Sequence, residues 1–467
     1  MQRSADYWNR AEQDFVILLC MRRFHDELWM QEQVARSTDV WNSLPARCTA
    51  DGPVYCQREQ EKRERAYDEA LAAVEKEAKR APRTRTERLK AQEQILASFG
   101  RFAGVAFDLN EEATRLLTDG FLPAGSEFAQ RARRFDADLS TDDIVQACRN
   151  AWTVCGLQPL LGMPMGLTPS VVGYSLLYPY SDNYLDSSAV DRSEKMRFSR
   201  RFLERLRGEA LPALNRREKA IWDLVAMIEA QYPRATCPQV FDCMIAIHRA
   251  QEESIAQLKS SANCDDAEVM RISCAKGGSS VLADACLCRG WVDEEESEFA
   301  FDWGVLLQLG DDLQDVREDV RRGSKTLFSR AAAMGTPIDE LTVRLLNMSN
   351  AVSNRMDRLP HGGRVLKDLL RMSWRSLIVM AVAQADAFFS PGFVAEMESR
   401  SPFRFGFLRA RQKRLAGRRG LYASLFDAFL QPRENNVERQ EHGDCDAVRA
   451  ESREIPLHRV ESLPIQI

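Results

Sequence analysis

Apolar residues recur at helical spacing along almost the whole chain, and this periodicity is the strongest constraint on its fold. Glycine and proline fall mostly between the periodic segments, as at Pro233 and in residues 360–363. The sequence has no clear run of alternating β-branched residues and no hairpin signal. These patterns predict an all-α protein in which many helices pack around a shared core.

The composition bounds the class of protein. The chain has 467 residues, of which 45% are hydrophobic and 28% charged, so it can form a sizeable core. A net charge of −5 argues against a nucleic-acid-binding protein, because such proteins usually carry a basic excess. The apolar run at residues 15–21 is too short to span a bilayer and lacks the flanks of a signal peptide. The twelve cysteines show no zinc-type spacing, so we expect reduced thiols in a cytoplasmic protein.

Changes in composition predict three regions. Residues 1–88 are expected to form an N-terminal helical extension, with a highly charged helix at 57–80 and a basic loop at 81–88. Residues 89–430 are more apolar, as expected for a packed helical bundle. Residues 431–467 lose the periodicity, which predicts a polar, flexible tail.

Two short acidic clusters carry the strongest functional signal. Asp182 and Asp186 are four residues apart, so on a helix both carboxylates lie on one face. Asp311, Asp315 and Asp319 repeat this spacing over about two helical turns. Like charges at this spacing destabilise an isolated helix, and a bound cation would offset that cost. The alternative interpretation is that each cluster is an ordinary solvent-exposed face.

Magnesium suits such clusters, because it is a hard cation that prefers oxygen ligands and shares its coordination shell with substrate phosphates. Two facing acidic helices can hold several magnesium ions. Those ions would bind a diphosphate and neutralise the charge that develops as it leaves. Nearby arginine and lysine side chains would donate hydrogen bonds to the same group. Together the two clusters predict a metal-dependent site for a diphosphate ester.

With these clusters in an all-helical chain, the sequence resembles the class I isoprenoid synthases. That superfamily includes terpene cyclases, chain-elongating prenyl synthases, and head-to-head squalene and phytoene synthases. Asp182-Asn-Tyr-Leu-Asp186 resembles the first aspartate-rich motif, with Asn183 where many members have a second Asp. The segment from Asp311 to Asp319 resembles the second motif. These motifs are typical of the superfamily as a whole.

A glycine-containing segment adds to the resemblance. Lys276-Gly277-Gly278 resembles the Lys-Thr-Gly helix of chain-elongating synthases and the glycine-broken helix of terpene cyclases. A Gly-Gly pair is expected to kink a helix and expose backbone carbonyls. The alternative is that these glycines allow close helix packing. The similarity covers residues 170–330 well and extends more loosely to residue 430.

The resemblance implies a class I isoprenoid synthase-type helical bundle with a central active-site cavity, a prenyl diphosphate substrate and magnesium, with three ions expected. It implies ionisation of an allylic diphosphate, cyclisation or rearrangement of the carbocation, and release of diphosphate. All five aspartates would then be catalytic and metal-binding. The side chains expected to hold the diphosphate are those of Arg271, Lys276, Arg322, Lys325 and Arg404.

Arg404 opens a run of seven basic residues within positions 404–419. Terpene cyclases often have an Arg-Tyr pair after the second motif that closes over the diphosphate, and Arg404-Phe405 is an approximate counterpart. The alternative is a basic surface, which leaves peripheral contact with anionic lipid open.

Other functions stay open from the sequence. The first is a condensing prenyl synthase, either head-to-head or chain-elongating, although the chain lacks the Gly-Lys-Arg segment that elongating members usually show. The second is a non-catalytic scaffold, which we would expect to have lost one acidic motif. The third is a helical diphosphate hydrolase, whose ligand sets are usually His-Asp or Glu-rich. Because dimers are common among proteins of this resemblance, a homodimer is a further expectation.

Overall fold

The computed structural model describes residues 27–47, 52–187, 190–257 and 265–430. Every regular element within these ranges is a helix, which confirms the all-α prediction. None of these helices combines the length and the apolar character needed to cross a membrane. The predicted tail at 431–467 lies outside the described residues.

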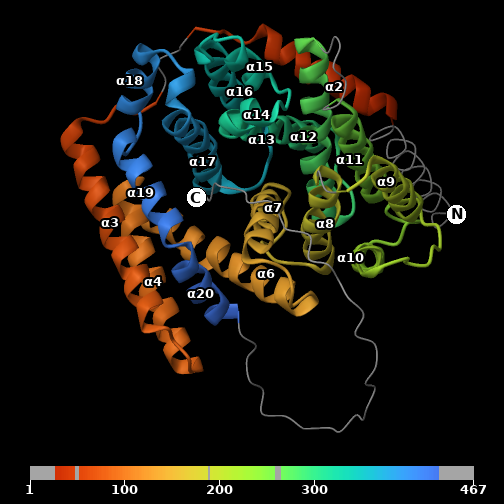
Figure 1. The fold of residues 1–467 in the computed structure, drawn as a ribbon, viewed down its shortest axis with the longest axis horizontal. Coiled ribbons are helices and arrows are strands. Elements are labelled where there is room, and N and C mark those ends of the chain that lie inside the picture. The colour runs from red at the N-terminus through yellow and green to blue at the C-terminus, as the bar shows by residue number, and fades with distance from the viewer. Residues whose placement is uncertain (1–26, 48–51, 188–189, 258–264, 431–467) are drawn as a thin grey trace, which may run out of the picture.

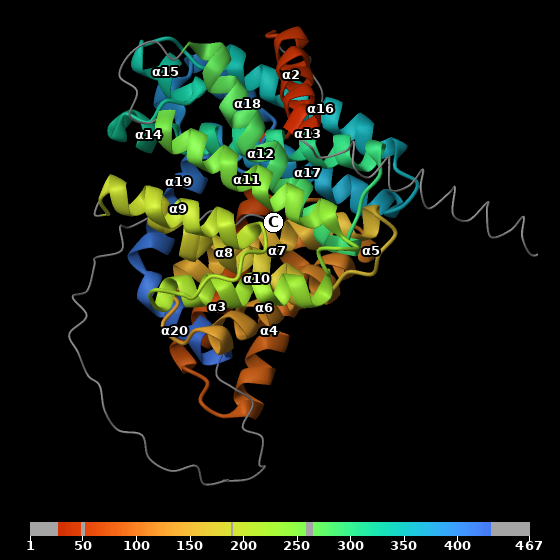
Figure 2. The same cartoon turned by 90° about the vertical axis from the view of Figure 1, so that its right-hand side faces the viewer.

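The helices follow one another along the chain with short connections (Figures 1 and 2). The N-terminal helices are α2 (Glu27–Ser43), α3 (Gln57–Arg80), α4 (Arg85–Ala106), α5 (Glu111–Arg115), the π-helix η1 (Leu116–Phe121) and α6 (Leu122–Phe135). The central helices are α7 (Thr141–Leu160), α8 (Pro169–Asp186), α9 (Arg192–Leu206), α10 (Arg216–Gln231), α11 (Pro238–Gln257), α12 (Asp266–Arg289) and α13 (Glu294–Gln314). The C-terminal helices are α14 (Val316–Arg322), α15 (Leu327–Ala333), α16 (Asp339–Arg358), α17 (Gly363–Gln384), the short 3₁₀ helix η2 (Asp386–Phe388), α18 (Pro391–Ser399), α19 (Phe405–Gly417) and α20 (Arg419–Leu430).

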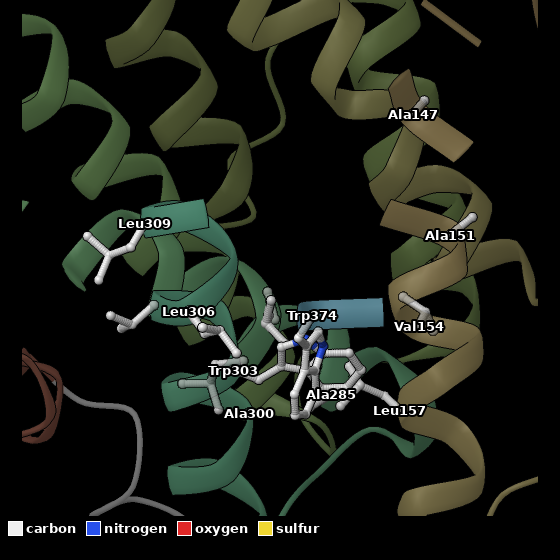
Figure 3. Packing of buried hydrophobic residues seen from close by; sticks show 14 of the residues in the cluster. Ala147, Ala151, Val154, Leu157, Ala285, Ala300, Trp303, Leu306, Leu309 and Trp374 are labelled. Carbon is white, nitrogen blue, oxygen red and sulfur yellow. The ribbon is translucent and has the colours of Figure 1, made fainter. Parts of the chain in front are cut away.

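The core centres on α12 and α13, which pack closely along each other. Helix α11 packs on α12, helix α7 packs on α12 and on α8, and α16 and α17 pack on α13. Figure 3 shows small and medium side chains of α7, among them Ala147 and Val154, together with Trp303 of α13 and Trp374 of α17. The two indole rings lie 5.3 Å apart, centroid to centroid. This buried apolar layer packs α7 against side chains of α13 and α17, with Trp303 and Leu370 next to Gly156 of α7.

The two glycines of the Lys276-Gly277-Gly278 segment lie inside α12, which continues through them to Arg289. A Cβ atom on Gly277 would lie 2.4 Å from the carbonyl oxygen of Gly304 in α13. A Cβ atom on Gly278 would lie 2.4 Å from the ring of Phe301. Helix α12 is therefore continuous at these glycines, and their contacts with α13 support the close-packing alternative.

The N-terminal helices differ in part from the prediction. Helix α3 has the predicted bounds of 57–80. Helix α4 begins at Arg85, because the side chain of Thr84 accepts a hydrogen bond from the backbone N–H of Glu87 at 3.2 Å. The Glu87 carboxylate accepts in turn from the Thr84 N–H at 3.0 Å, which completes a capping box. The expected basic loop therefore ends at residue 84, and the expected boundary at residue 88 falls inside α4.

Candidate functional site

The second acidic motif lies at the junction of α13 and α14. Asp315 connects the two helices, so the predicted single helix is interrupted there. The backbone hydrogen bonds nevertheless persist along the acidic stripe, which is formed by Asp311, Asp315 and Asp319. The N–H of Asp315 donates to the carbonyl oxygen of Asp311, and the N–H of Asp319 donates to that of Asp315, each at 2.9 Å. The three aspartates therefore keep the predicted spacing of one per turn through the junction.

A fourth carboxylate, Asp312, is buried beside this stripe. It accepts hydrogen bonds from Ser273 Oγ of α12 at 3.1 Å and from Gln308 Nε2 at 2.8 Å. Burial raises the pKa of Asp312 to about 6, although these hydrogen bonds and the charge of Lys276 act in the opposite direction. The sequence analysis missed Asp312, because its spacing from Asp315 does not fit the four-residue repeat.

Asp319 is a second carboxylate of this motif with a raised pKa. Burial, together with the charges of Asp312 and Asp315, raises the pKa of Asp319 to about 7. The acidic motif is therefore not an ordinary solvated helix face. Carboxylates that are held this close together and partly removed from water repel one another, which favours their protonated forms.

Cationic side chains from three helices surround the motif. Arg149 of α7 places its Nη2 atom 2.8 Å from Oδ1 of Asp311. The charge of Lys276, on α12, acts on Asp312. Arg322 of α14 lies near the stripe, since its charge lowers the pKa of Asp319, and it also pairs with Glu318 at 2.6 Å. The structure thus places two of the five predicted diphosphate ligands, Lys276 and Arg322, at the second motif.

Arg149 has no signal in the sequence, because its partner Asp311 lies 162 positions further along the chain. Its helix also contacts the helix that carries the first motif. Gln146 Nε2 of α7 donates to the hydroxyl of Tyr178 in α8 at 3.0 Å. Tyr178 lies one turn before Asp182. Helix α7 therefore connects the two acidic motifs.

The first motif occupies the C-terminal end of α8. Oδ1 of Asp182 accepts a hydrogen bond from Ser181 Oγ at 3.0 Å. Asn183 Nδ2 donates to Oδ1 of Asp143 in α7 at 3.0 Å. Asp186 is the last residue of α8, and its side chain lies outside the described part of the structure. Helix α8 packs on α7, α10 and α12. Of these, α7 and α12 also carry side chains that act on the second motif, namely Arg149 and Lys276.

Arg271 and Lys325 are two further side chains that were predicted to hold the diphosphate. Arg271 pairs with Glu253 of α11 at 3.0 Å and with Glu268 of its own helix at 2.8 Å, so its described ion pairs do not involve the acidic motifs. Lys325 follows Ser324, whose N–H donates to the carbonyl oxygen of Asp319 at 2.9 Å. The chain at Lys325 therefore lies next to the end of the second motif.

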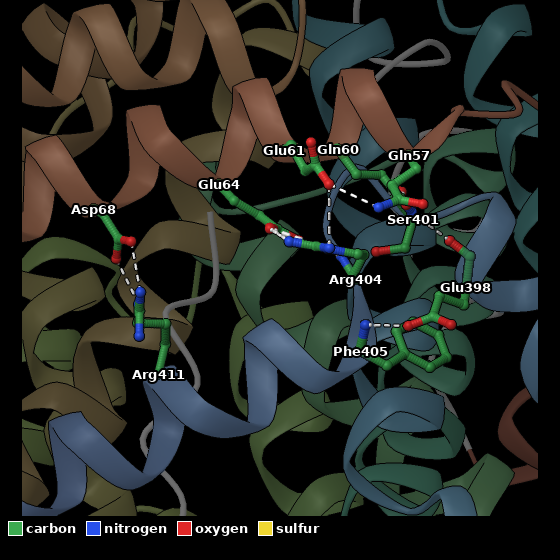
Figure 4. Close-up of polar contacts among 10 residues, drawn as sticks. All are labelled: Gln57, Gln60, Glu61, Glu64, Asp68, Glu398, Ser401, Arg404, Phe405 and Arg411. Carbon is green, nitrogen blue, oxygen red and sulfur yellow. Dashed lines mark hydrogen bonds and ion pairs between the residues drawn. The ribbon is translucent and has the colours of Figure 1, made fainter.

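Arg404 lies at a different place in the fold (Figure 4). Its Nε atom donates to Oε1 of the buried Glu64 in α3 at 2.9 Å, and its Nη1 atom pairs with Glu61 at 3.4 Å. Within the part of the chain that the structure describes, both ion-pair partners of Arg404 belong to α3. The structure therefore does not bring Arg404 to the acidic motifs, as the resemblance to terpene cyclases led us to expect.

Other arginines of the basic run also pair with α3, whereas Arg409 and Arg419 pair with Asp386 and Asp142. Arg411 pairs with Asp68, as Figure 4 shows, and Arg414 Nη2 lies 2.7 Å from Oε2 of Glu75. The hydrogen bond from Arg414, together with those from Tyr422 and Arg418, lowers the pKa of Glu75 to about 2. The basic run is thus largely an internal contact between α19–α20 and α3, rather than the open basic surface considered from the sequence.

A second polar cluster lies deeper, between α7, α8 and α12. Asn150 Nδ2 donates to Oδ1 of Asp284 at 2.9 Å and to Ser175 Oγ at 3.0 Å. Asp284 is fully buried, and its Oδ2 atom has no hydrogen-bond partner within the described residues. Burial raises the pKa of Asp284 well above its ordinary value, because removal from water disfavours the charged form of the carboxyl. The sequence analysis did not select this residue.

One cavity of about 380 Å³ is lined by apolar and polar side chains of α16 together with Val40 and Asp302, and none of its lining residues belongs to either acidic motif. Asp302 is paired there with Arg36 at 3.0 Å and with Arg355 at 3.0 Å. The expected central active-site cavity stays a prediction.

The donor set of the second motif suits a hard divalent cation. Its ligand atoms are carboxylate oxygens, which magnesium prefers over sulfur or nitrogen. The described cysteines are free thiols, most of them buried in the core. As the side chains stand, no three His, Cys, Asp or Glu residues of the described ranges are arranged around a single metal position. Carboxylate rotamers would therefore have to change for a cation to bind.

No protein-family model, curated protein or solved structure matches the chain significantly.

Proposed function

We propose that the protein is a magnesium-dependent class I terpene synthase. It would ionise an allylic prenyl diphosphate, cyclise or rearrange the carbocation, and release diphosphate. The observation that carries the proposal is the second acidic motif. Its crowded carboxylates lie at the junction of α13 and α14, and cations from α7, α12 and α14 surround them.

In this proposal Asp311, Asp315 and Asp319 hold the metal from one side, and Asp182 and Asp186 hold it from α8. Bound magnesium would supply the positive charge that stabilises the departing diphosphate. Each of these ligands is a carboxylate, so deprotonation of the acidic stripe is a condition for binding.

The protein's own cations would orient the leaving group. Lys276 and Arg322 lie at the acidic stripe, so both can donate to diphosphate oxygens. Asp312 has a supporting role, because it is buried and accepts from Ser273 across the α12–α13 contact. It thereby fixes the position of α12, and with it Lys276, relative to the acidic stripe. Lys325, at the end of α14, is the remaining proposed ligand from this region.

The test is incubation of the purified protein with magnesium and geranyl, farnesyl or geranylgeranyl diphosphate, each with and without isopentenyl diphosphate. Organic extracts are analysed by mass spectrometry, and released diphosphate is measured. A hydrocarbon or alcohol formed from one allylic diphosphate alone supports a terpene synthase. A longer diphosphate formed only with isopentenyl diphosphate, or a product with doubled carbon number, supports a condensing synthase instead.

Asp311→Asn should lower turnover by at least about a hundredfold, since it removes a metal ligand. Asp223→Asn is the matched control, because Asp223 lies on α10 and pairs with Lys219 at 2.6 Å on the surface. Equal loss in both variants, or full activity of Asp311→Asn, would contradict the proposed site. Absence of diphosphate release from every substrate would contradict the function.

A further inference from the structure

An ion pair between Arg149 and Asp311, at 2.8 Å, joins α7 to the second acidic motif. Both side chains are partly exposed, at 36% for Arg149 and 43% for Asp311. The charges of Asp311 and Asp315 both raise the pKa of Arg149. The guanidinium therefore lies over the carboxylates that the proposed function assigns to the metal.

The backbone of α7 at this point is firmly held. The neighbouring Asn150 is hydrogen-bonded to Ser175 of α8 and to Asp284 of α12. One turn earlier, Gln146 is hydrogen-bonded to Tyr178 of α8. Motion of the Arg149 side chain thus requires no movement of the helix, because its long, flexible stem can reorient from a fixed base.

Asp311 cannot offer the same Oδ1 atom to a guanidinium and to a divalent cation at full strength. A partly exposed ion pair contributes little stability, so a divalent cation can displace it. The displaced guanidinium remains beside the site, with several N–H donors arranged in a plane. This arrangement matches the oxygen atoms of a phosphate group better than a lysine does.

We infer that Arg149 is an exchange residue of the acidic site. It pairs with Asp311 until a divalent cation takes that carboxylate, and it then donates to the diphosphate bound by the cation. The inference rests on the proposed function, which assigns Asp311 to the metal and a diphosphate to the site. It predicts that Arg149 opposes binding of the metal alone and favours binding of the metal together with diphosphate.

The experiment measures binding rather than turnover. Binding of Mn²⁺ to the full-length protein is followed by the electron paramagnetic resonance signal of free Mn²⁺, first alone and then with inorganic diphosphate. Arg149→Gln is compared with wild type and with Arg200→Gln. Arg200 is the matched control for loss of one positive charge, because its side chain is 82% exposed and pairs only with Glu204 among its described partners. Thermal denaturation in the presence of EDTA checks that each variant is folded.

In the expected result, Arg149→Gln binds Mn²⁺ alone about two- to fivefold more tightly than wild type. The same variant loses about tenfold or more of the affinity for inorganic diphosphate in the presence of Mn²⁺. Arg149→Lys should recover part of that loss. Arg200→Gln should behave like wild type in both measurements.

Two other results overturn the inference in distinguishable ways. If wild type binds Mn²⁺ and Arg149→Gln matches it in both measurements, Arg149 has no exchange role, while the metal site stands. The same holds if Arg149→Gln weakens binding of Mn²⁺ alone. If wild type binds neither Mn²⁺ nor diphosphate, the proposed function fails, and the inference fails with it.

Discussion

Gly277 of α12 and Gly304 of α13 face each other so closely that neither position has room for a side chain. A Cβ atom on Gly277 would lie 2.4 Å from the Gly304 carbonyl oxygen, and a Cβ atom on Gly304 would lie 2.0 Å from the Gly277 carbonyl oxygen. This approach brings the backbones of the two helices together below the second acidic motif. It lets Ser273 of α12 reach Asp312 of α13 at 3.1 Å.

Gly277→Ala should therefore destabilise the protein, although alanine is the better helix former. The added methyl group meets backbone atoms, so the helices must separate, which costs about 1–3 kcal/mol. The measurement is urea denaturation followed by circular dichroism. Gly406→Ala is the control, because Gly406 lies in α19 with no atom within 4 Å of the added methyl group. Unchanged stability of Gly277→Ala would show that the α12–α13 contact is looser than described.

Asp284→Asn should change how stability depends on pH. Burial raises the pKa of Asp284 in the folded protein, so folding favours its neutral form. Its contribution to stability is then full below the unfolded-state pKa of about 4 and is lost as pH rises. Asparagine keeps an oxygen acceptor for Asn150 and cannot ionise.

At pH 8 we therefore expect Asp284→Asn to be more stable than wild type by at least about 1 kcal/mol, with little difference near pH 4. Denaturation curves at several pH values give the comparison. Asp223→Asn, on the surface of α10, should follow wild type throughout. Parallel pH profiles for wild type and Asp284→Asn would mean that the buried carboxyl does not titrate as its environment indicates.

Divalent cations should bind more tightly as pH rises from 5.5 to 7.5. Burial is the main cause that raises the pKa of Asp319, a proposed metal ligand, to about 7, so a proton occupies this carboxyl in the lower part of the range. A carboxylate must be deprotonated to bind a metal, and the affinity for Mn²⁺ should increase by about tenfold or more across the range. Calorimetric titration at each pH measures it. A flat profile would place Mn²⁺ at a different set of ligands.

Arg404→Gln should lower thermal stability without affecting Mn²⁺ binding. The change leaves the buried carboxylate of Glu64 without its main partner, and an unpaired buried charge is destabilising. The double variant Arg404→Gln/Glu64→Gln should recover part of the lost stability, because it also removes the unpaired carboxylate. A double-mutant cycle measures this recovery.

The control is Arg364→Gln, because the Arg364 side chain is 93% exposed and its pair with Asp368 lies in water. Arg364→Gln should leave the melting temperature unchanged. If Arg404→Gln is as stable as wild type but no longer binds inorganic diphosphate, the role first expected for Arg404 from the sequence is correct.

The local structure of this chain follows from short-range sequence patterns. Periodicity predicted an all-α chain and the bounds of α3, because helix formation depends on residues three or four positions apart. The same short range fixed the spacing of Asp311, Asp315 and Asp319, which persists through the α13–α14 junction. The start of α4 is also encoded locally, in the Thr84–Glu87 capping box, and lies before the predicted boundary at residue 88.

The contacts of individual polar and glycine residues depend instead on the tertiary structure. Asp312 and Asp315 are both aspartates of one acidic run, yet the former is buried against α12 and the latter is exposed. Arg149 meets Asp311 across 162 positions, and Arg404 meets Glu64 across 340. Burial and pairing depend on how helices are placed relative to one another, and that placement results from packing of the whole core rather than from any local pattern.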